Sequence, residues 1–220
     1  MEKHLLEVKN FSISFTQYER GTRQTSLQVI RGLDVTVDPG ELVAVIGSSG
    51  SGKSLLAHAV MGILPYNASA SGEILYRGEV LTPRRQKELR GKEIVLVPQS
   101  VSYLDPLMKV GEQVRNGRRG EAIREKCRRI LGSYGLGPET ENLYPFQLSG
   151  GMTRRVLISS AVMEEPRLVI ADEPTPGLHL EAAKRVLGHF KEMTETGAGV
   201  LLITHDLELA LEVADRVAVL

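Results

Sequence analysis

Short hydrophobic runs alternate along the chain with stretches in which hydrophobic residues recur at helical spacing. The middle runs are hydrophobic at consecutive positions, so both faces of each would be buried, which is typical of strands in a mostly parallel sheet. This pattern predicts strands at 42–47, 93–98, 167–172, 199–204 and 216–220. It predicts helices at 53–63, 181–195 and 206–214. The alternation indicates an α/β fold whose strand ends offer loops to ligands.

The N-terminal part of the chain has a different pattern. The segments LLEVKNFSISF at 5–15 and LQVIRGLDVTVDPGE at 27–41 resemble antiparallel strands. The sequence Asp38-Pro39-Gly40 is typical of a turn, and we expect it to close this pair of strands. An antiparallel β part is therefore predicted ahead of the α/β alternation.

The strand-like runs stop between about Gln99 and Glu165. Within this stretch, EAIREKCRRILGSYG at 121–135 has helical spacing with basic residues on one side, which is most simply a solvated helix face. We therefore expect a nucleotide-binding α/β core, including the antiparallel part, formed by 1–98 and 166–220. An α-helical segment is expected to be inserted at 99–165.

The composition is ordinary for a soluble globular protein, with 42% hydrophobic and 25% charged residues among 220. The formal net charge is zero, which gives no indication of a nucleic-acid partner. Cys127 is the single cysteine, so an internal disulfide is excluded and a reducing compartment is favoured. No hydrophobic run approaches the ~18 residues of a transmembrane helix, and the start, MEKHLLEVKN, lacks the apolar centre of a signal peptide. We expect a cytoplasmic location.

The segment GSSGSGKS at 47–54 matches the phosphate-loop pattern G-x-x-x-x-G-K-[ST]. A predicted strand precedes it and a predicted helix follows, as this kind of site requires. Glycines allow backbone N–H groups to face phosphates, Lys53 adds a positive charge, and Ser54 offers a hydroxyl to Mg²⁺. The alternative is a surface loop rich in Gly and Ser. The nucleotide-binding residues predicted here are Gly47, Ser48, Ser49, Gly50, Ser51, Gly52, Lys53 and Ser54.

Four polar residues follow predicted strands and would meet at one edge of the sheet. Asp172 and Glu173 end RLVIADE; Asp172 is expected to hold Mg²⁺, and Glu173 to polarise the attacking water as general base. Gln99 is expected to reach Mg²⁺ or the water, and His205 to hydrogen-bond the γ-phosphate. Each of these residues alone is more simply explained as a turn or loop residue, but the phosphate loop in the same chain favours catalytic roles.

A second loop, YPFQLSGGMTRR at 144–155, also resembles a phosphate-binding helix start. It offers Ser149, Gly150 and Gly151 but has no lysine and no metal ligand of its own. We therefore expect it to complete a nucleotide site on another subunit, with two chains arranged head to tail. The alternative is an ordinary serine N-cap followed by flexible glycines.

The ordered set GSSGSGKS, Gln99, LSGGM, LVIADE and His205 resembles the ATP-binding subunits of ABC (ATP-binding cassette) transporters over nearly the whole chain. The resemblance implies a P-loop NTPase core of RecA-like type, with ATP and Mg²⁺ bound. It also implies that LSGGM is the signature motif and that two cassettes enclose two ATP molecules. By position, Phe15 would stack on adenine, and Tyr18 is a less favoured substitute.

A finer similarity is to importers of the peptide and nickel type, carried by QSVSYLDPLMKVGEQV at 99–114 and by YPFQLSGGM. It implies an ATPase on the cytoplasmic face of the membrane that energises uptake of peptides, nickel or metal chelates. The partners implied are a second, identical or related cassette, two membrane permease subunits and, indirectly, an extracytoplasmic solute-binding protein. We expect the permeases to dock on 101–114, at Tyr103, Leu104 and Met108; packing under the helical segment is the alternative.

Two residues depart from the family pattern. Arg154 stands where a Gln is usual after the signature, and His179 replaces the usual Asp of the loop that follows the catalytic Glu. Because that loop crosses the dimer interface in the family, His179 counts against a symmetric homodimer, although the sequence leaves both a homodimer and a heterodimer open. The chain ends at Leu220, whereas family members of this type generally continue further.

Three other functions are alternatives. A soluble ABC ATPase acting on ribosomes would carry two cassettes in one chain, and one acting on DNA would carry a long coiled coil before the signature. A GTPase would carry an N-K-x-D motif, which the sequence lacks. A non-hydrolysing regulatory cassette is disfavoured because Glu173 and His205 are both present.

Overall fold

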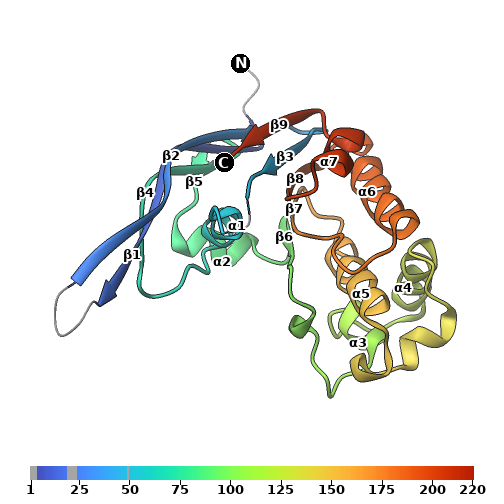
Figure 1. Ribbon diagram of the computed structural model, residues 1–220. Coiled ribbons are helices and arrows are strands. Elements are labelled where there is room, and N and C mark those ends of the chain that lie inside the picture. The colour runs from blue at the N-terminus through green and yellow to red at the C-terminus, as the bar shows by residue number, and fades with distance from the viewer. Residues whose placement is uncertain (1–3, 19–23, 49) are drawn as a thin grey trace.

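The computed structural model describes residues 4–18, 24–48 and 50–220 and contains two sheets (Figure 1). The antiparallel sheet has the strand order β2-β1-β4-β5. Its strands are β1 (Leu6–Tyr18), β2 (Gln24–Val37), β4 (Ala68–Tyr76) and β5 (Glu79–Val80). The predicted antiparallel pairing of the first two strands is confirmed, with Leu6 opposite Val37 and Phe15 opposite Leu27.

The second sheet is parallel and has the strand order β6-β7-β8-β3-β9. Its strands are β3 (Leu42–Ile46), β6 (Ile94–Val97), β7 (Leu168–Asp172), β8 (Gly199–Thr204) and β9 (Arg216–Val219). Every residue of β7 and β8 is buried, which explains why these segments are hydrophobic without alternation. The predicted α/β fold with a parallel sheet is confirmed, and each of the five strands lies within a predicted range.

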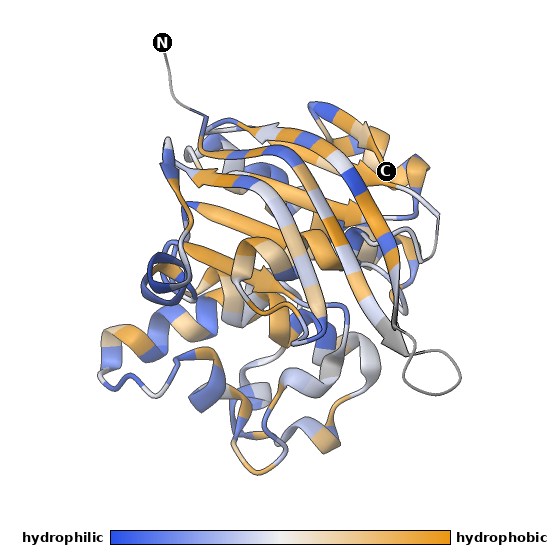
Figure 2. Cartoon of the chain, turned by 90° about the vertical axis from the view of Figure 1, so that its left-hand side faces the viewer, coloured by the Kyte–Doolittle hydropathy of each residue, from blue (hydrophilic) through white to orange (hydrophobic). Residues whose placement is uncertain are grey.

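Alternate residues of the parallel strands enter two different cores. Val43 and Val45 face a core shared with the antiparallel sheet and α1 (Lys53–Met61). Leu42 and Ala44 face the opposite core, which is covered by α6 (Leu180–Glu195), α7 (Leu207–Val213) and part of α5 (Gly150–Val162). Figure 1 shows α1 between the two sheets, and in Figure 2 the strands carry long hydrophobic stretches.

Residues 99–165 lie between β6 and β7 and contain helices but no strand. These helices are α3 (Val110–Val114), α4 (Glu121–Ser133) and α5, accompanied by the 3-10 turns η1 (Val101–Tyr103), η2 (Pro138–Asn142) and η3 (Pro145–Gln147). They have a core of their own that includes Leu104, Cys127 and Leu131. Figure 1 places them together at the end of the molecule away from β1. None of the helices in the described parts of the chain is long and apolar enough to cross a membrane.

Two expectations for the N-terminal half need correction. The turn at Asp38–Gly40 does not close the antiparallel pair; it connects β2 to β3, which belongs to the other sheet. The prediction also missed β4, β5 and α2 (Pro83–Leu89). The first half of β4, ASASG, has no hydrophobic periodicity because it is mostly exposed, so the pattern that reveals a half-buried strand is missing there.

Candidate functional site

The phosphate loop connects β3 to α1 and requires glycine at defined points. Gly50 and Gly52 have positive φ angles of 83° and 95°, which side chains with a Cβ rarely adopt. A Cβ on Gly52 would lie 2.8 Å from Val29 Cγ1, and one on Gly47 would lie 2.6 Å from the Leu220 carbonyl oxygen. The glycine spacing therefore follows from the local geometry of the loop. The predicted Ser49 lies outside the described residues.

Lys53 is the first residue of α1, and its amine lies inside the loop. Nζ donates to the carbonyl oxygens of Gly47, at 2.7 Å, and Ser48, at 2.8 Å. Among the residues that the structure describes, the buried Ser51 Oγ has no hydrogen-bond partner. A buried polar atom without a partner is unfavourable, so the loop fits a polar ligand that would satisfy it.

Ser54 and Asp172 bring two oxygen ligands together at the end of β7. Ser54 Oγ donates to Asp172 Oδ1 at 3.1 Å. Burial raises the pKa of the Asp172 carboxyl, and the hydrogen bond from Ser54 offsets part of that effect. Hydroxyl and carboxylate oxygens are ligands that Mg²⁺ accepts, so this pair fits a magnesium ion shared with a phosphate.

Glu173 follows Asp172 and is held on several sides. Its carboxylate Oε1 lies 2.8 Å from His205 Nδ1, and its Oε2 accepts from Thr204 Oγ1 at 3.5 Å. Its backbone is in the left-handed region, with φ of 48°, which is uncommon for a residue with a side chain. His205 reaches it because β8, which ends at Thr204, pairs directly with β7. These contacts within the chain therefore orient the carboxylate.

Most of these side chains line one cavity of about 500 Å³, a size typical of small-molecule sites, whereas Asp172 contacts it only through Ser54. The residues lining it are Val29, Gly50, Gly52, Lys53, Ser54, Leu55, Gln99, Glu173 and His205. Residues predicted from four separate segments therefore meet at one edge of the parallel sheet. Their individual roles in catalysis and metal binding stay predictions.

Phe15, the residue predicted to stack on adenine, does not line the cavity. It lies on β1, packs against the core between the sheets, and is absent from the described residues that line the cavity. The side chain of Tyr18, its predicted substitute, lies outside the described residues. Adenine stacking by either residue stays a prediction.

Four residues that lie at or beside the site were not identified from the sequence. Val29 and Leu55 line the cavity, Thr204 contacts Glu173, and Arg154 donates to two backbone carbonyls at the site. Val29 alternates with the buried Ile30 on β2, so the strand pattern places these two residues on opposite faces without indicating which face meets a ligand. For Arg154, the available signal was its position just after the signature, where the family usually has Gln.

The second loop begins α5 and lies outside this cavity. Ser149 is the N-cap of α5, and its Oγ accepts from the Met152 amide at 3.3 Å. A Cβ on Gly150 would meet nothing within 4 Å, and one on Gly151 would make only ordinary contact with Leu178. Among the described residues that line the cavity, Ser149, Gly150 and Gly151 are absent. The serine cap is real, and the loop leaves space in front of the helix start.

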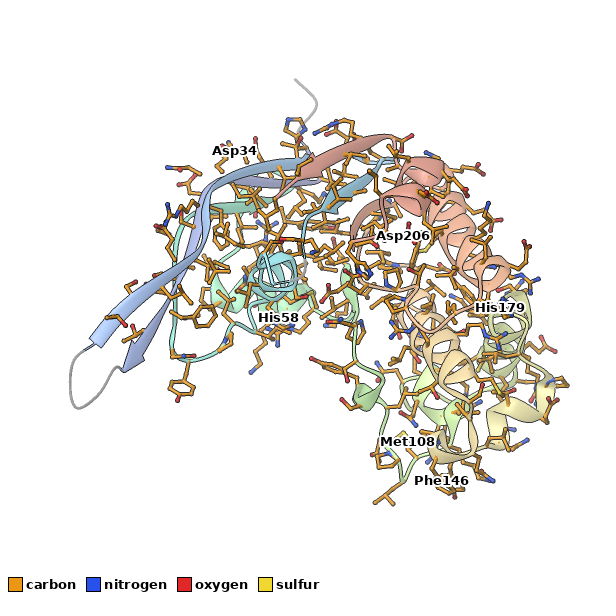
Figure 3. All side chains as sticks on the ribbon, viewed as in Figure 1. Asp34, His58, Met108, Phe146, His179 and Asp206 are labelled. Carbon is orange, nitrogen blue, oxygen red and sulfur yellow. The ribbon has the colours of Figure 1, made fainter. Side chains whose placement is uncertain are left out.

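His179 is the N-cap of α6, where its Nδ1 accepts from the Ala182 amide at 3.2 Å. Figure 3 shows it on the side of the molecule that carries the helices. Aspartate is among the strongest N-cap residues, so the histidine retains a capping function with a larger, aromatic side chain.

Exposed hydrophobic residues gather on the segment after Gln99. The exposed fractions are 59% for Tyr103, 87% for Leu107 and 38% for Met108. Leu104, in contrast, is buried in the core of the helical segment, so its expected role in docking was wrong. In Figure 3, Met108 and the exposed Phe146 lie at the same end of the molecule.

Comparisons of the sequence agree on one family. The ABC transporter profile matches residues 30–176. The chain is 38% identical over 231 residues to the oligopeptide transport ATP-binding protein of Bacillus subtilis (strain 168), covering 98% of this chain and 63% of that protein. It is 38% identical to the dipeptide transport ATP-binding protein of the same strain, with coverages of 100% and 68%. For the glutathione import ATP-binding protein of Pectobacterium atrosepticum the identity is 35%, with coverages of 100% and 38%.

The fold also matches solved structures. A dimeric bacterial ABC transporter cassette superimposes with a TM-score of 0.83 at 27% identity, covering 98% of this chain and 94% of that chain. A dimeric post-hydrolysis state of an ATP-binding cassette with ADP and Pi has a TM-score of 0.82 at 27% identity, with the same coverages. These likenesses confirm the predicted P-loop NTPase core.

Proposed function

Because the chain belongs to the ABC transporter family, we propose that it is the ATP-hydrolysing subunit of an importer, with peptides as the transported solute. One observation carries the proposal: Lys53 and Ser54 of the loop and the Glu173–His205 pair line one cavity, and Asp172 is hydrogen-bonded to Ser54. These residues would supply phosphate-binding groups, ligands for a metal ion and a base, which are the parts that ATP hydrolysis requires.

ATP is the substrate that these residues would bind. The backbone N–H groups of 47–54 and the start of α1 attract the phosphates, and the Lys53 amine exchanges its contacts with Gly47 and Ser48 for phosphate oxygens. Ser54 and Asp172 would hold Mg²⁺, and Gln99, which lines the same cavity as Ser54, would contribute to holding it. When bound, the ion would neutralise negative charge on the phosphate oxygens.

Glu173 is proposed to accept a proton from the attacking water. Its carboxylate is almost fully buried and is held by His205 at Oε1 and by Thr204 at Oε2, so these two contacts fix its position beside the cavity. His205 is largely exposed and can reach toward the terminal phosphate as well as Glu173. Gln99 lines the same cavity and would orient the water or the metal ion.

A second cassette is proposed to complete the site. Ser149, Gly150 and Gly151 lie outside the chain's own cavity, and the similar cassettes of known structure are described as dimeric. The start of α5 would then present N–H groups and the Ser149 hydroxyl to the γ-phosphate bound by the other chain. The second chain is either a copy of this one or a related cassette.

Peptide import is proposed from the names of the relatives, which concern oligopeptides, dipeptides and glutathione. Nickel or metal chelates, which the sequence pattern also allowed, are not named by these three. The full system would include two membrane permease subunits, which place the chain at the cytoplasmic face of the membrane. It would also include an extracytoplasmic solute-binding protein, in contact with the permeases rather than with this chain.

The permeases are proposed to dock on Tyr103, Leu107 and Met108. Large exposed hydrophobic residues that lie together are typical of a protein contact. The segment begins directly after Gln99, so a change at the nucleotide would reach the permease over a short path. Cysteine cross-linking from positions 103 and 108 to the permeases tests the contact. Failure at both positions, with transport intact, would place the docking site elsewhere.

The experiment that tests the proposed activity compares ATP binding and hydrolysis by the wild-type chain and Lys53→Ala. The substitution removes the charge that the loop holds, so ATP binding should fall severely and hydrolysis should be abolished. Lys87→Ala, on an exposed turn of α2, is the matched control and should change neither. Equal ATP affinity in wild type and Lys53→Ala, measured by calorimetry, would contradict the proposal.

A further inference from the structure

Arg154 on α5 is a buried cation that joins two strand ends. Its Nη1 donates to the Glu173 carbonyl oxygen at 2.6 Å, and its Nη2 donates to the Gln99 carbonyl oxygen at 2.9 Å. The residue is 8% exposed. Glu173 follows β7 and Gln99 follows β6, so one guanidinium connects the helix of the signature to both sides of the cavity.

The bond to Glu173 holds a backbone conformation that is unfavourable by itself. Glu173 has a positive φ of 48°, where a Cβ crowds the backbone. Its amide donates to the Ile203 carbonyl oxygen at 2.9 Å, and its carbonyl accepts from Arg154. Hydrogen bonds from a charged donor are stronger than those from a neutral one. Together the two contacts fix the main chain from which the carboxylate projects.

Arg154 is also unusual because its charged side chain is buried and bonded to backbone carbonyls. Among the described residues, Arg154 forms no ion pair within 4 Å, although burial disfavours its charge and lowers its pKa. The negative charge of Glu173 opposes that effect, and an arginine side chain stays protonated in proteins. A buried cation is costly unless its donors are satisfied, and here two of its nitrogens are bonded to backbone at the cavity.

We propose that Arg154 is a positioning residue for hydrolysis, which transmits the orientation of α5 to Glu173 and Gln99. The inference rests on the proposed roles of those two residues. A guanidinium has two separate terminal nitrogens in a rigid plane, so it spans two carbonyl oxygens that a single amide nitrogen would not hold in the same way. A rotation of α5, whose first residues form the signature, would therefore move the base and the strand end after β6 together.

The test uses Arg154→Met, Arg154→Lys and Arg154→Gln. If Arg154 positions the base, kcat should fall at least tenfold in Arg154→Met while the Kd for ATP stays within twofold. Arg154→Lys should lose less, because an ammonium keeps the charge but has one nitrogen. Arg154→Gln gives an intermediate loss and serves as the second variant if Arg154→Met does not fold, as judged by its Tm.

Arg155→Met is the matched control. Arg155 is the next residue of α5, and its guanidinium donates to carbonyls of Gly151, Tyr134 and Gly135, which all lie within the helical segment. The Arg155→Met variant should have a lower Tm than the wild type, but its kcat should change by less than twofold. If Arg154→Met and Arg155→Met lose the same amount of kcat, Arg154 acts only through the general packing of α5, and the inference is overturned.

A double-mutant cycle separates this inference from the proposed function. In a Glu173→Gln background, Arg154→Met should cause a much smaller loss of turnover than in the wild type, because its effect through Glu173 is already absent and only its effect through Gln99 remains. Independent, multiplicative losses would overturn the positioning role. Full turnover in Glu173→Gln alone would instead overturn the proposed base. An inactive Glu173→Gln together with a fully active Arg154→Met would overturn only the role of Arg154.

Discussion

Glu173 Oε1 and His205 Nδ1 lie 2.8 Å apart, although the two residues are 32 positions apart in the chain. They come from the ends of β7 and β8, which are adjacent in the parallel sheet. Adjacent parallel strands bring their C-terminal ends to the same edge, so the contact follows from the strand order. The pair thus connects the buried carboxylate to the more exposed imidazole at the mouth of the cavity.

The first prediction concerns His205. Replacing it with Ala removes one of the two side chains that hold the Glu173 carboxylate but leaves the phosphate loop untouched. We expect turnover of ATP to fall by about 10²-fold, the lower end of the usual contribution of a general base, because Glu173 loses the partner that orients it, with ATP affinity nearly unchanged. Parallel measurements of kcat and of ATP binding check this. A large loss of affinity with normal kcat would mean that His205 mainly binds substrate.

The second prediction concerns Asp172 and stability. Burial raises the pKa of this carboxyl, so the folded chain holds the proton more tightly than the unfolded chain. The stability that this provides is fully present below the unfolded pKa of about 4 and is lost as pH rises through the folded pKa. Near neutral pH the charged Asp172 is therefore destabilising without a cation. Asp172→Asn should raise Tm at about pH 7 in the absence of nucleotide, and the difference should shrink toward about pH 4.

The same variant should lose function. An amide has no charge to offer Mg²⁺, so the gain in Tm that Mg-ATP gives to the wild type should be much smaller in Asp172→Asn. Thermal unfolding with and without Mg-ATP, at both pH values, measures the two effects in one series. If Asp172→Asn lowers the Tm of the nucleotide-free protein at neutral pH, the carboxylate stabilises the fold, and the prediction is wrong.

The third prediction concerns the head-to-tail site. Gly151→Asp should leave ATP binding by its own chain intact, because this residue is not among those that line the cavity and a Cβ there would make only ordinary contacts. Hydrolysis should collapse, because a negative group would meet the γ-phosphate of the other chain. Mixing Gly151→Asp with Lys53→Ala should restore activity if the chain pairs with itself, since one site then has an intact loop and an intact signature. Abolished ATP binding by monomeric Gly151→Asp would overturn the shared site.

The strands of the parallel sheet, the helices α1, α6 and α7, and the clustering of the polar residues at one sheet edge could be predicted from sequence. Their signals are local: hydrophobic runs for β7 and β8, and a glycine pattern for 47–54. β4 could not be predicted, because its exposed first half depends on pairing with β1 rather than on burial. The path of the chain after Asp38 could not be predicted either, since a turn sequence does not say which strands it joins.

Side-chain partners far apart in sequence were the least predictable feature of the site. Arg154 stood out as a departure from the family pattern, but its two carbonyl partners at Gln99 and Glu173 depend on how α5 packs against β6 and β7. Leu104 was expected at the surface because it lies in a loop-like stretch, yet it packs with Val110 and Leu131 in the core of the helical segment. Both outcomes are set by tertiary packing, which neither periodicity nor spacing records.

The most direct test of ATP hydrolysis at this site is turnover by Glu173→Gln, with ATP binding measured on the same preparation. Gln keeps the shape of the side chain and the contacts of the neighbouring Asp172, but it cannot accept the proton. The account predicts ATP affinity close to that of the wild type and turnover lower by about 10²- to 10⁴-fold, the usual contribution of a general base. Turnover at the wild-type rate, with ATP bound as before, would contradict it.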